Sequence, residues 1–324
     1  MSQYEPTLID IIKAEQQLRP HLWDTTARRS PALSERFKTD IYLKPENLQR
    51  MGSFKIRGAF NRVTELATAG ATAVVTASAG NHGQGVVYAA NAAGLRATII
   101  VPKTASEAKI EALRRMGAEL RLMGTTFDEA EDAAYEFAVT HALPVVSPYD
   151  AAVIAGQGTV GYELLVETPD LDLLLIPVSA GGLLAGCAIA AKAMNSNIQI
   201  VGVQTEASPS MVAALRAGRI VNVPCVDSLA DGLGGNIARG QLPFSIIQRL
   251  VDDVVLVGEE SIAAAMRLFA ATERMIVEGA GAVGLAALLD GRIDVSGKRV
   301  GLVISGGNVS FETLRSVFTG PVPL

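Results

Sequence analysis

Residues 173–186 read Leu-Leu-Leu-Ile-Pro-Val-Ser-Ala-Gly-Gly-Leu-Leu-Ala-Gly, and this stretch decides the fold class. Its apolar first half has the length of a buried β-strand, and the glycine pair that follows favours a tight turn. The run from Leu173 to Ala191 contains no charged residue, and its length would be sufficient to cross a bilayer. Pro177, Ser179 and the glycine pair interrupt this run. We therefore expect a strand, a turn and the beginning of a helix instead of a membrane span.

The same alternation of apolar strand-like runs and alanine-rich amphipathic runs covers most of the chain. Such alternation predicts an α/β protein with mainly parallel sheets flanked by helices. Before these runs, Thr7 and Asp10 form a capping pair at the start of a helical pattern that ends before Pro20. The expected strands are Ile41–Leu43, Ala73–Ala77, Ala97–Val101, Leu120–Leu122, Leu173–Val178, Ile198–Val203, Val254–Val257 and Val300–Ile304.

The composition is that of an ordered globular protein. A chain of 324 residues can form two compact lobes. Its 28 basic and 33 acidic side chains are interspersed and give a net charge of -5, which argues against a nucleic-acid partner. The first 18 residues are acidic where a signal peptide would need a basic start, so we expect a cytoplasmic protein without a membrane segment. Cys187 and Cys225 are expected to be two unpaired, buried thiols.

Glycine-rich turns follow three of the expected strands directly. They are Ser78–Gly85, Ser179–Gly186 and Ser305–Asn308. In open α/β sheets, ligands bind beyond the carboxyl ends of the strands. The backbone N–H groups of such turns bind anions well when they lie at helix N-termini. We expect the three turns to converge on one anionic ligand.

Lys55 lies in the octapeptide Gly52-Ser53-Phe54-Lys55-Ile56-Arg57-Gly58-Ala59, among small and apolar residues. Partial burial lowers the pKa of a lysine amine and frees the amine for Schiff-base chemistry. A single lysine is most often a solvated surface charge. The prediction therefore depends on the whole octapeptide and on the other motifs of the chain.

Five motifs occur in order over almost the full chain. They are the octapeptide, Ser78-Ala79-Gly80-Asn81-His82-Gly83-Gln84-Gly85, Ser179–Gly186, Glu278-Gly279-Ala280-Gly281-Ala282 and Ser305-Gly306-Gly307-Asn308. Together they resemble the fold-type-II pyridoxal-phosphate enzymes, and within them the serine/threonine dehydratase (threonine ammonia-lyase) and serine racemase group. The resemblance implies a two-lobed fold like that of the tryptophan synthase β-subunit. A large cofactor-binding domain would comprise residues 1–48 and 151–324, and a small substrate-side domain residues 49–150.

The resemblance also implies pyridoxal 5'-phosphate as the cofactor and gives roles to individual residues. Lys55 would carry the cofactor and act as the catalytic base, with Phe54 packed against the ring and Asn81 bonded to its phenolic oxygen. Ser305 would face the pyridine nitrogen. Because a hydroxyl does not keep that nitrogen protonated, the ring would be a weaker electron sink, which favours β-elimination. The other implied cofactor contacts are Ala180, Gly181, Gly182, Leu183, Leu184, Glu278 and Gly306.

The resemblance places the substrate carboxylate on a second cradle of backbone amides, formed by Ser78, Ala79, Gly80, Asn81 and His82. A general-base role for His82 is the alternative, but with Lys55 as the base we assign His82 to packing. Tyr149 would lie near the substrate side chain. Many threonine dehydratases have His-Pro-Phe-Asp where this chain has residues 147–150, Ser-Pro-Tyr-Asp. The change leaves room for a bulkier substrate, such as a phenylserine or a hydroxylated compatible-solute derivative.

Ala79 separates the two activities of the group. Racemases of this group have a serine there, on the ring face opposite the lysine, because racemisation needs a proton donor on both faces. Alanine favours dehydration and deamination of a β-hydroxy amino acid, L-threonine, L-serine or a bulkier analogue, to a 2-oxo acid and ammonia. The alternatives are a racemase of the same fold, a hydroxyectoine-derivative dehydratase and a catalytically idle binding protein. We expect a homodimer or a homotetramer.

We expect no metal ion. Some relatives bind one through a glutamate after the strand that matches Ile198–Val203 and an aspartate six residues later. Glu206 is present, but position 212 is Val212. The sequence ends at Leu324, without residues for the regulatory domain of biosynthetic threonine dehydratases. We therefore expect no feedback control of that type.

Overall fold

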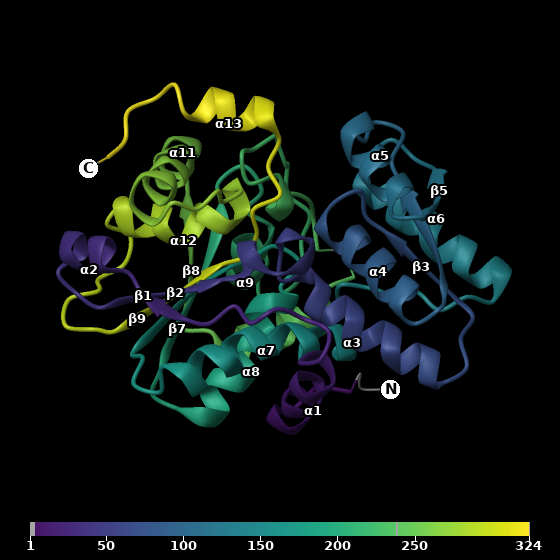
Figure 1. Ribbon diagram of the computed structural model, residues 1–324, viewed down its shortest axis with the longest axis horizontal. Coiled ribbons are helices and arrows are strands. Elements are labelled where there is room, and N and C mark those ends of the chain that lie inside the picture. Colours follow the sequence, from purple (N-terminus) through teal and green to yellow (C-terminus); the bar gives the residue numbers. More distant parts are fainter. Residues whose placement is uncertain (1–3, 238, 324) are drawn as a thin grey trace.

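Two sheets organise the fold. The computed structural model describes residues 4–237 and 239–323 (Figure 1). The larger sheet has the strand order β1-β2-β9-β6-β7-β8 and is parallel except for β1, while the smaller sheet, β3-β4-β5, is parallel throughout. The strands are β1 Arg28–Arg29, β2 Ile41–Pro45, β3 Ala73–Ala77, β4 Arg96–Val101, β5 Glu119–Leu122, β6 Leu173–Pro177, β7 Gln199–Thr205, β8 Asp253–Val257 and β9 Val300–Ile304.

Helices cover both faces of each sheet, as Figure 1 shows. One face of the larger sheet packs against α1 Leu8–Leu18, α7 Ala151–Glu167, α8 Gly182–Met194, α9 Ser210–Ala217 and α10 Gln241–Leu250. Its other face packs against α2 Pro31–Phe37, α11 Glu259–Leu268, α12 Gly279–Leu289 and α13 Phe311–Val317. The smaller sheet lies between α3 Lys55–Thr68, α4 Asn81–Ala92 and α5 Glu107–Arg115 on one face and α6 Phe127–His141 on the other. Short 3-10 turns at Glu46–Leu48, Arg50–Gly52 and Asp231–Leu233 and a π-helical turn at Phe269–Glu273 complete these elements.

Strand β6 explains why the larger sheet needs two helical layers. Successive side chains of a strand point to opposite faces. Leu174 and Ile176 belong to the apolar core with α7 and α8, whereas Leu173 and Leu175 belong to the core with α11 and α12. A continuous apolar run is therefore the signature of a strand that is buried on both sides.

The predicted fold class is confirmed, and all eight predicted strands are present within one to two residues. Strand β6 and helix α8 divide the uncharged run as expected, and none of the described helices is long and apolar enough to cross a membrane. At α1, the Asp10 carboxylate accepts hydrogen bonds from the Thr7 N–H and the Thr7 hydroxyl, at 2.8 and 2.6 Å. This is the predicted capping pair.

The prediction of two buried thiols is wrong for one of them. Cys187 is buried in α8, but Cys225 is exposed. Cys225 lies between α9 and the turn at Asp231, in a stretch that forms neither helix nor strand. Irregular segments of this kind run over the surface, because a buried one would leave backbone polar groups without partners. The hydropathy of a cysteine alone does not reveal such a surrounding.

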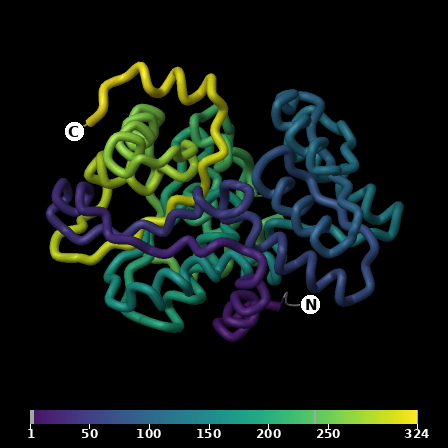
Figure 2. Tube along the Cα trace, viewed as in Figure 1, coloured from purple at the N-terminus to yellow at the C-terminus, as the bar shows by residue number. Residues whose placement is uncertain are grey.

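Segments from the two ends of the sequence meet in the larger sheet. Strand β2 pairs in parallel with β9, so that Pro45 lies beside Ile304. In Figure 2 the purple N-terminal trace accordingly runs beside the yellow C-terminal one. The chain then builds the smaller sheet, and α7 returns it to the larger one. The exact domain boundaries at residues 49 and 150 stay a prediction.

Candidate active site

The three glycine-rich turns converge, as the sequence predicts. Strands β6 and β9 are parallel neighbours, so the turns after Pro177 and Ile304 lie at the same edge of the larger sheet. The turn after β3 meets them from the smaller sheet, because Asn81 is hydrogen-bonded to Asn308. The candidate site therefore lies between the two sheets.

Lys55 is the first residue of α3, and the segment before it is fixed to the turn after β9. Ser53 forms an antiparallel bridge with Gly306, and the Phe54 N–H donates to the Ser305 carbonyl oxygen at 3.1 Å. The partly buried Lys55 amine lies 5.1 Å from the centroid of the Phe54 ring. Burial lowers the pKa of Lys55 to about 8, although the Glu278 carboxylate acts against this shift. A neutral, nucleophilic amine is thus accessible near neutral pH.

Glu278, Asn81 and Asn308 form a hydrogen-bonded ring that we call the Glu278 cluster. The Asn81 amide donates to Glu278 Oε1 at 2.9 Å, and the Asn308 amide donates to Asn81 Oδ1 at 2.8 Å. The Asn308 backbone N–H closes the ring by donating to Glu278 Oε2 at 3.0 Å. The ring joins the N-terminus of α4, the N-cap of α12 and the turn after β9.

Glu278 is buried in this cluster, and its donors are neutral amides. Burial raises the pKa of Glu278 to about 7, and the hydrogen bonds from Asn81 and Asn308 offset only part of the shift. Glu278 therefore holds its proton more readily than an ordinary glutamate does. It lies close enough to Lys55 for each charge to affect the pKa of the other.

His82 is buried directly after Asn81, in the first turn of α4. Its Nε2 lies 3.0 Å from the Val146 carbonyl oxygen, so Nε2 carries the ring proton. Burial and the charge of Lys55 lower the pKa of His82 to about 4. A neutral imidazole that is fixed to the backbone is consistent with packing.

The N-terminus of α8 is shaped to let an anion approach the backbone. Gly181 has a φ of 91°, and a Cβ at Gly182 would lie 2.9 Å from the Pro148 carbonyl oxygen. No side chain of the described residues caps this helix at Gly181, and none caps α4 at Gly80. The first N–H groups of a helix have no partners within the helix. Ala180, Gly181, Gly182, Leu183 and Leu184 are therefore suited to bind a phosphate.

The remaining predicted site residues lie around the same edge. Ser78 accepts a hydrogen bond from the Gly80 N–H at 3.2 Å, and a Cβ at Gly80 would meet no described atom within 4 Å, so the turn borders open space. Ala79 is partly buried, whereas Ser305 and Gly306 are buried. Tyr149 is also buried, with its ring 3.3 Å from the position that a Cβ of Gly240 would take. Burial raises the pKa of the Tyr149 phenol.

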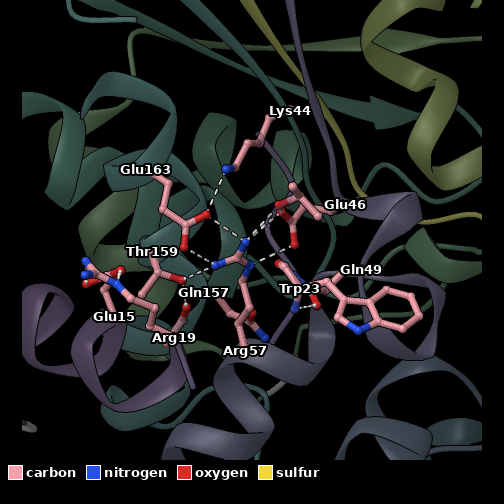
Figure 3. A network of polar contacts seen from close by, with 12 residues as sticks. Glu15, Arg19, Trp23, Lys44, Glu46, Gln49, Arg57, Gln157, Thr159 and Glu163 are labelled. Atoms are coloured by element: carbon pink, nitrogen blue, oxygen red, sulfur yellow. Dashed lines mark hydrogen bonds and ion pairs between the residues drawn. The ribbon is translucent and has the colours of Figure 1, made fainter. Parts of the chain in front are cut away.

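Sequence reasoning missed a second set of residues beside Lys55. The Arg57 guanidinium is buried and binds the carboxylates of Glu46 and Glu163 together with the hydroxyls of Thr25 and Thr159, as Figure 3 shows in part. Lys44 forms an ion pair with Glu163 at 2.8 Å. These six residues are the Arg57 cluster. Lys44 and Glu46 lie directly after the apolar residues 41–43 of a predicted strand. Because charged residues are buried only with partners, these two residues could have indicated a buried ion-pair cluster.

The position considered for a metal is occupied differently. The Glu206 carboxylate forms an ion pair with Arg292, with 3.7 Å between Oε1 and Nη2. Among the described residues, no three His, Cys, Asp or Glu side chains are grouped so that they could hold a metal ion.

Comparison with known proteins gives consistent results. The family described as "Pyridoxal-phosphate dependent enzyme" matches residues 18–306. The L-threonine ammonia-lyase of Thermotoga maritima is 45% identical over 96% of this chain and 78% of its own length. The catabolic L-threonine dehydratase of Escherichia coli K12 is 39% identical over 95% of this chain and 94% of its own. The solved structure of maize serine racemase superposes with a TM-score of 0.90 at 30% identity, covering 98% of both chains.

The chain belongs to the family of pyridoxal-phosphate-dependent enzymes. Its cofactor is pyridoxal phosphate, and its curated relatives place it among the ammonia-lyases of this family. The predicted resemblance, cofactor and enzyme class are thereby confirmed.

Proposed function

We propose that this enzyme removes water and then ammonia from L-threonine or L-serine and releases a 2-oxo acid. The names of the two curated relatives support a threonine substrate. Alanine at position 79 is the observation that carries the reaction type, because it leaves Lys55 as the one proposed acid–base group at the substrate. Racemisation would need a second proton donor.

The residues of the site fit pyridoxal phosphate. We propose that Lys55 anchors it, with Phe54 against the ring and Asn81 at the phenolic oxygen. The amides of residues 180–184 would hold the phosphate, Ser305 would face the pyridine nitrogen, and Gly306 would be a further cofactor contact. The donor chemistry supports this assignment, since the partly buried Lys55 amine of lowered pKa lies among helix N-termini that no described side chain caps.

When bound, the cofactor supplies an electron sink that makes the α-proton of the substrate acidic. We propose that the substrate carboxylate binds the amides of residues 78–82, with the α-proton toward Lys55. With a pKa of about 8, Lys55 is partly neutral near pH 7 and accepts that proton. His82, with a pKa of about 4, stays neutral and orients the turn. We propose that Glu278 keeps Asn81 oriented, and that Tyr149 borders the substrate side chain.

A substrate screen tests this proposal. The purified enzyme is incubated with the L and D forms of threonine, serine and phenylserine, and both 2-oxo acid and ammonia are measured. We expect equal amounts of the two products from L-threonine or L-serine. If phenylserine alone is converted, the proposed substrates L-threonine and L-serine are wrong, and the substrate is a bulkier β-hydroxy amino acid. Inverted amino acid without 2-oxo acid would contradict a lyase and support the racemase alternative, which the likeness to maize serine racemase keeps open.

The finer features stay part of the proposal. We propose a small domain of residues 49–150 inserted into a large domain of residues 1–48 and 151–324. We further propose a cytoplasmic homodimer or homotetramer, whose mass light scattering after gel filtration would measure. A monomer that is fully active would contradict the oligomer.

A further inference from the structure

The Arg57 guanidinium is saturated by acceptors. Its Nε and Nη2 bind Glu46 at 2.8 and 2.9 Å, and its Nη1 and Nη2 bind Glu163 at 2.6 and 2.8 Å. Thr25 and Thr159 accept two further hydrogen bonds, at 3.0 Å each. Figure 3 shows the guanidinium between the two carboxylates. Only the planar fork of an arginine can bind two carboxylates side-on in this way.

Three of the four acceptor residues lie in the segments that connect the two sheets, and the fourth, Thr25, lies between α1 and β1. Glu46 directly follows β2, before the chain enters the smaller sheet. Glu163 and Thr159 lie in α7, which returns the chain to the larger sheet. Arg57 itself lies in the first turn of α3, two residues after Lys55. The cluster therefore ties both crossings of the chain to the turn that carries the lysine.

The cluster also relates Lys55 to Ser305. Glu46 follows Pro45, and Ser305 follows Ile304, which is the parallel partner of Pro45. The ion pair between Arg57 and Glu46 thus fixes the first turn of α3 to the strand pair that ends at Ser305. Our proposal for the active site places Lys55 at the aldehyde carbon and Ser305 at the ring nitrogen of the same cofactor.

Besides the contacts of Arg57, the side-chain hydrogen bonds described between this turn and α7 are those of the neutral Gln157. Gln157 accepts from the Gly58 N–H at 3.2 Å and donates to the Lys55 carbonyl oxygen at 3.5 Å. The helices touch at Gly58 and Gly156, since a Cβ at Gly156 would lie 2.6 Å from the Gly58 Cα. Such packing sets the distance between the two helices but allows one helix to slide along the other. The side-on hydrogen bonds of Arg57 with Glu46 and Glu163 are directional and oppose this sliding.

We propose that Arg57 is a positioning residue, which holds the Lys55 amine in register with Ser305 through its forks onto Glu46 and Glu163. A buried ion-pair cluster gains little net stability over apolar packing, because each charge must be desolvated. The cluster instead fixes the position of the lysine, which apolar packing would not do. This inference rests on Lys55 being the cofactor lysine.

The test compares Arg57→Lys with Arg62→Lys in the cofactor-loaded enzyme. Lysine keeps the charge at position 57 but cannot form the forks. Arg62 is the matched control, since it lies on the same helix and binds Asp150 at 3.2 Å and Glu65 at 2.8 Å. For Arg57→Lys we expect kcat to fall on the order of 100-fold with a KM change below about threefold, the loss typical of a displaced catalytic group. For Arg62→Lys we expect both constants to stay within about twofold.

A second readout needs no substrate. The absorbance of the lysine-linked cofactor is titrated with pH, and the linkage is trapped with borohydride. We expect the titration midpoint to move in Arg57→Lys and to stay in Arg62→Lys, because the displaced amine has a different electrostatic surrounding. If the proposed reaction fails but the midpoint moves, the positioning role stands without the proposed substrate. If the thermal midpoint of Arg57→Lys falls while kcat, KM and the titration midpoint stay unchanged, Arg57 is merely structural and the proposal is overturned.

A milder variant covers the case in which Arg57→Lys does not fold. Thr159→Val removes one acceptor of the Arg57 guanidinium, together with the hydrogen bond that the Thr159 hydroxyl donates to Gly156 at 2.7 Å. We expect a kcat loss of about 3- to 10-fold and a smaller shift of the titration midpoint in the same direction. An unchanged kcat together with an unchanged midpoint would contradict the proposal.

Discussion

The Arg57 cluster and the Glu278 cluster both hold buried or partly buried carboxylates near Lys55, yet the hydrogen-bond donors and charges around these carboxylates differ. Glu163 is matched by two cations, Arg57 and Lys44. Burial raises its pKa, but the charge and hydrogen bonds of Arg57 outweigh this effect, so its pKa lies below the ordinary value. Glu278 is held by neutral amides, and burial raises its pKa to about 7. Paired charges keep a carboxylate ionised and a segment in place, while neutral donors leave a carboxyl group that can gain or lose a proton.

The largest expected effect concerns Lys55, which lies near both clusters. Lys55→Ala removes the anchor and the base together, so we expect turnover to fall by about 10⁴-fold or more. The thermal unfolding midpoint of the cofactor-free protein should not fall, because neither cluster uses the amine in a hydrogen bond. Steady-state kinetics and calorimetry measure the two quantities. Retained activity with a borohydride-trapped cofactor would show that another lysine is the anchor.

The second prediction breaks the Arg57 cluster without touching Lys55. Glu46→Gln leaves the Arg57 charge only partly compensated, and breaking a buried ion pair costs about 3–5 kcal/mol of the free energy of unfolding. The matched control is Glu107→Gln, whose exposed ion pair with Arg114 has a distance of 3.0 Å. Its removal should change stability by less than about 1 kcal/mol. Urea unfolding measures both variants, and equal effects would refute the distinction between paired and solvated charges.

The third prediction concerns the pH dependence that Glu278 gives to stability. Its pKa is about 7 in the folded chain against 4.5 for an ordinary glutamate, so between these values the folded state binds more protons than the unfolded state. The contribution of Glu278 to stability should therefore fall as pH rises from about 4.5 to about 7, by at most about 3 kcal/mol. His82, whose pKa is lowered to about 4, acts in the opposite direction below about pH 6.5. Glu278→Gln should remove this contribution, so that the difference in unfolding free energy between the two proteins changes with pH. Urea unfolding of the cofactor-free protein at several pH values measures it, and an identical slope in both proteins would contradict the raised pKa.

The smallest expected effect adds a proton donor beside the Glu278 cluster. The native enzyme should return almost no inverted substrate, whereas Ala79→Ser should give detectable racemisation together with slower elimination. Chiral chromatography of the residual substrate after partial turnover measures both. Rapid inversion by the native enzyme would show that a second acid is present and would remove the argument from Ala79. The absence of racemisation in Ala79→Ser alone would be weaker evidence against the argument, since a hydroxyl misplaced by about 1 Å loses most of its catalytic effect.

Local patterns predicted most of the fold and much of the candidate site. Most strands were visible because they are buried on at least one face and are therefore runs of apolar residues. Strand β5 is mostly exposed, and its alternation of charged residues and leucines indicated it instead. Strand β1 was missed, since Arg28 and Arg29 are two charged residues that pair only because β2 lies beside them. The turns at Ser78, Ser179 and Ser305 were predicted because each follows a strand.

Long-range polar partners could not be predicted from spacing. Arg57 and Glu46 are 11 residues apart, but Glu163 is 106 residues from Arg57. A charge in an apolar segment indicates that a partner exists and does not say which one. Asn308 was quoted within a motif yet was not assigned to the site, since its link to Asn81 depends on how the two sheets meet. The exposure of Cys225 was missed because the hydropathy of a cysteine does not show that its segment is irregular and runs over the surface.

The hydrogen bond from Phe54 to Ser305 also sets an order of events during synthesis of the chain. Residue 54 leaves the ribosome long before residue 305, and the lysine turn is complete only when strand β9 has entered the sheet beside β2. Closing such a long loop is an entropic cost that early contacts of the smaller sheet do not share. Strands β3, β4 and β5 are close together in sequence and can pair while the chain is still growing. On the proposed site, where Ser305 and Gly306 contact the cofactor, a chain truncated before β9 would lack part of the cofactor site.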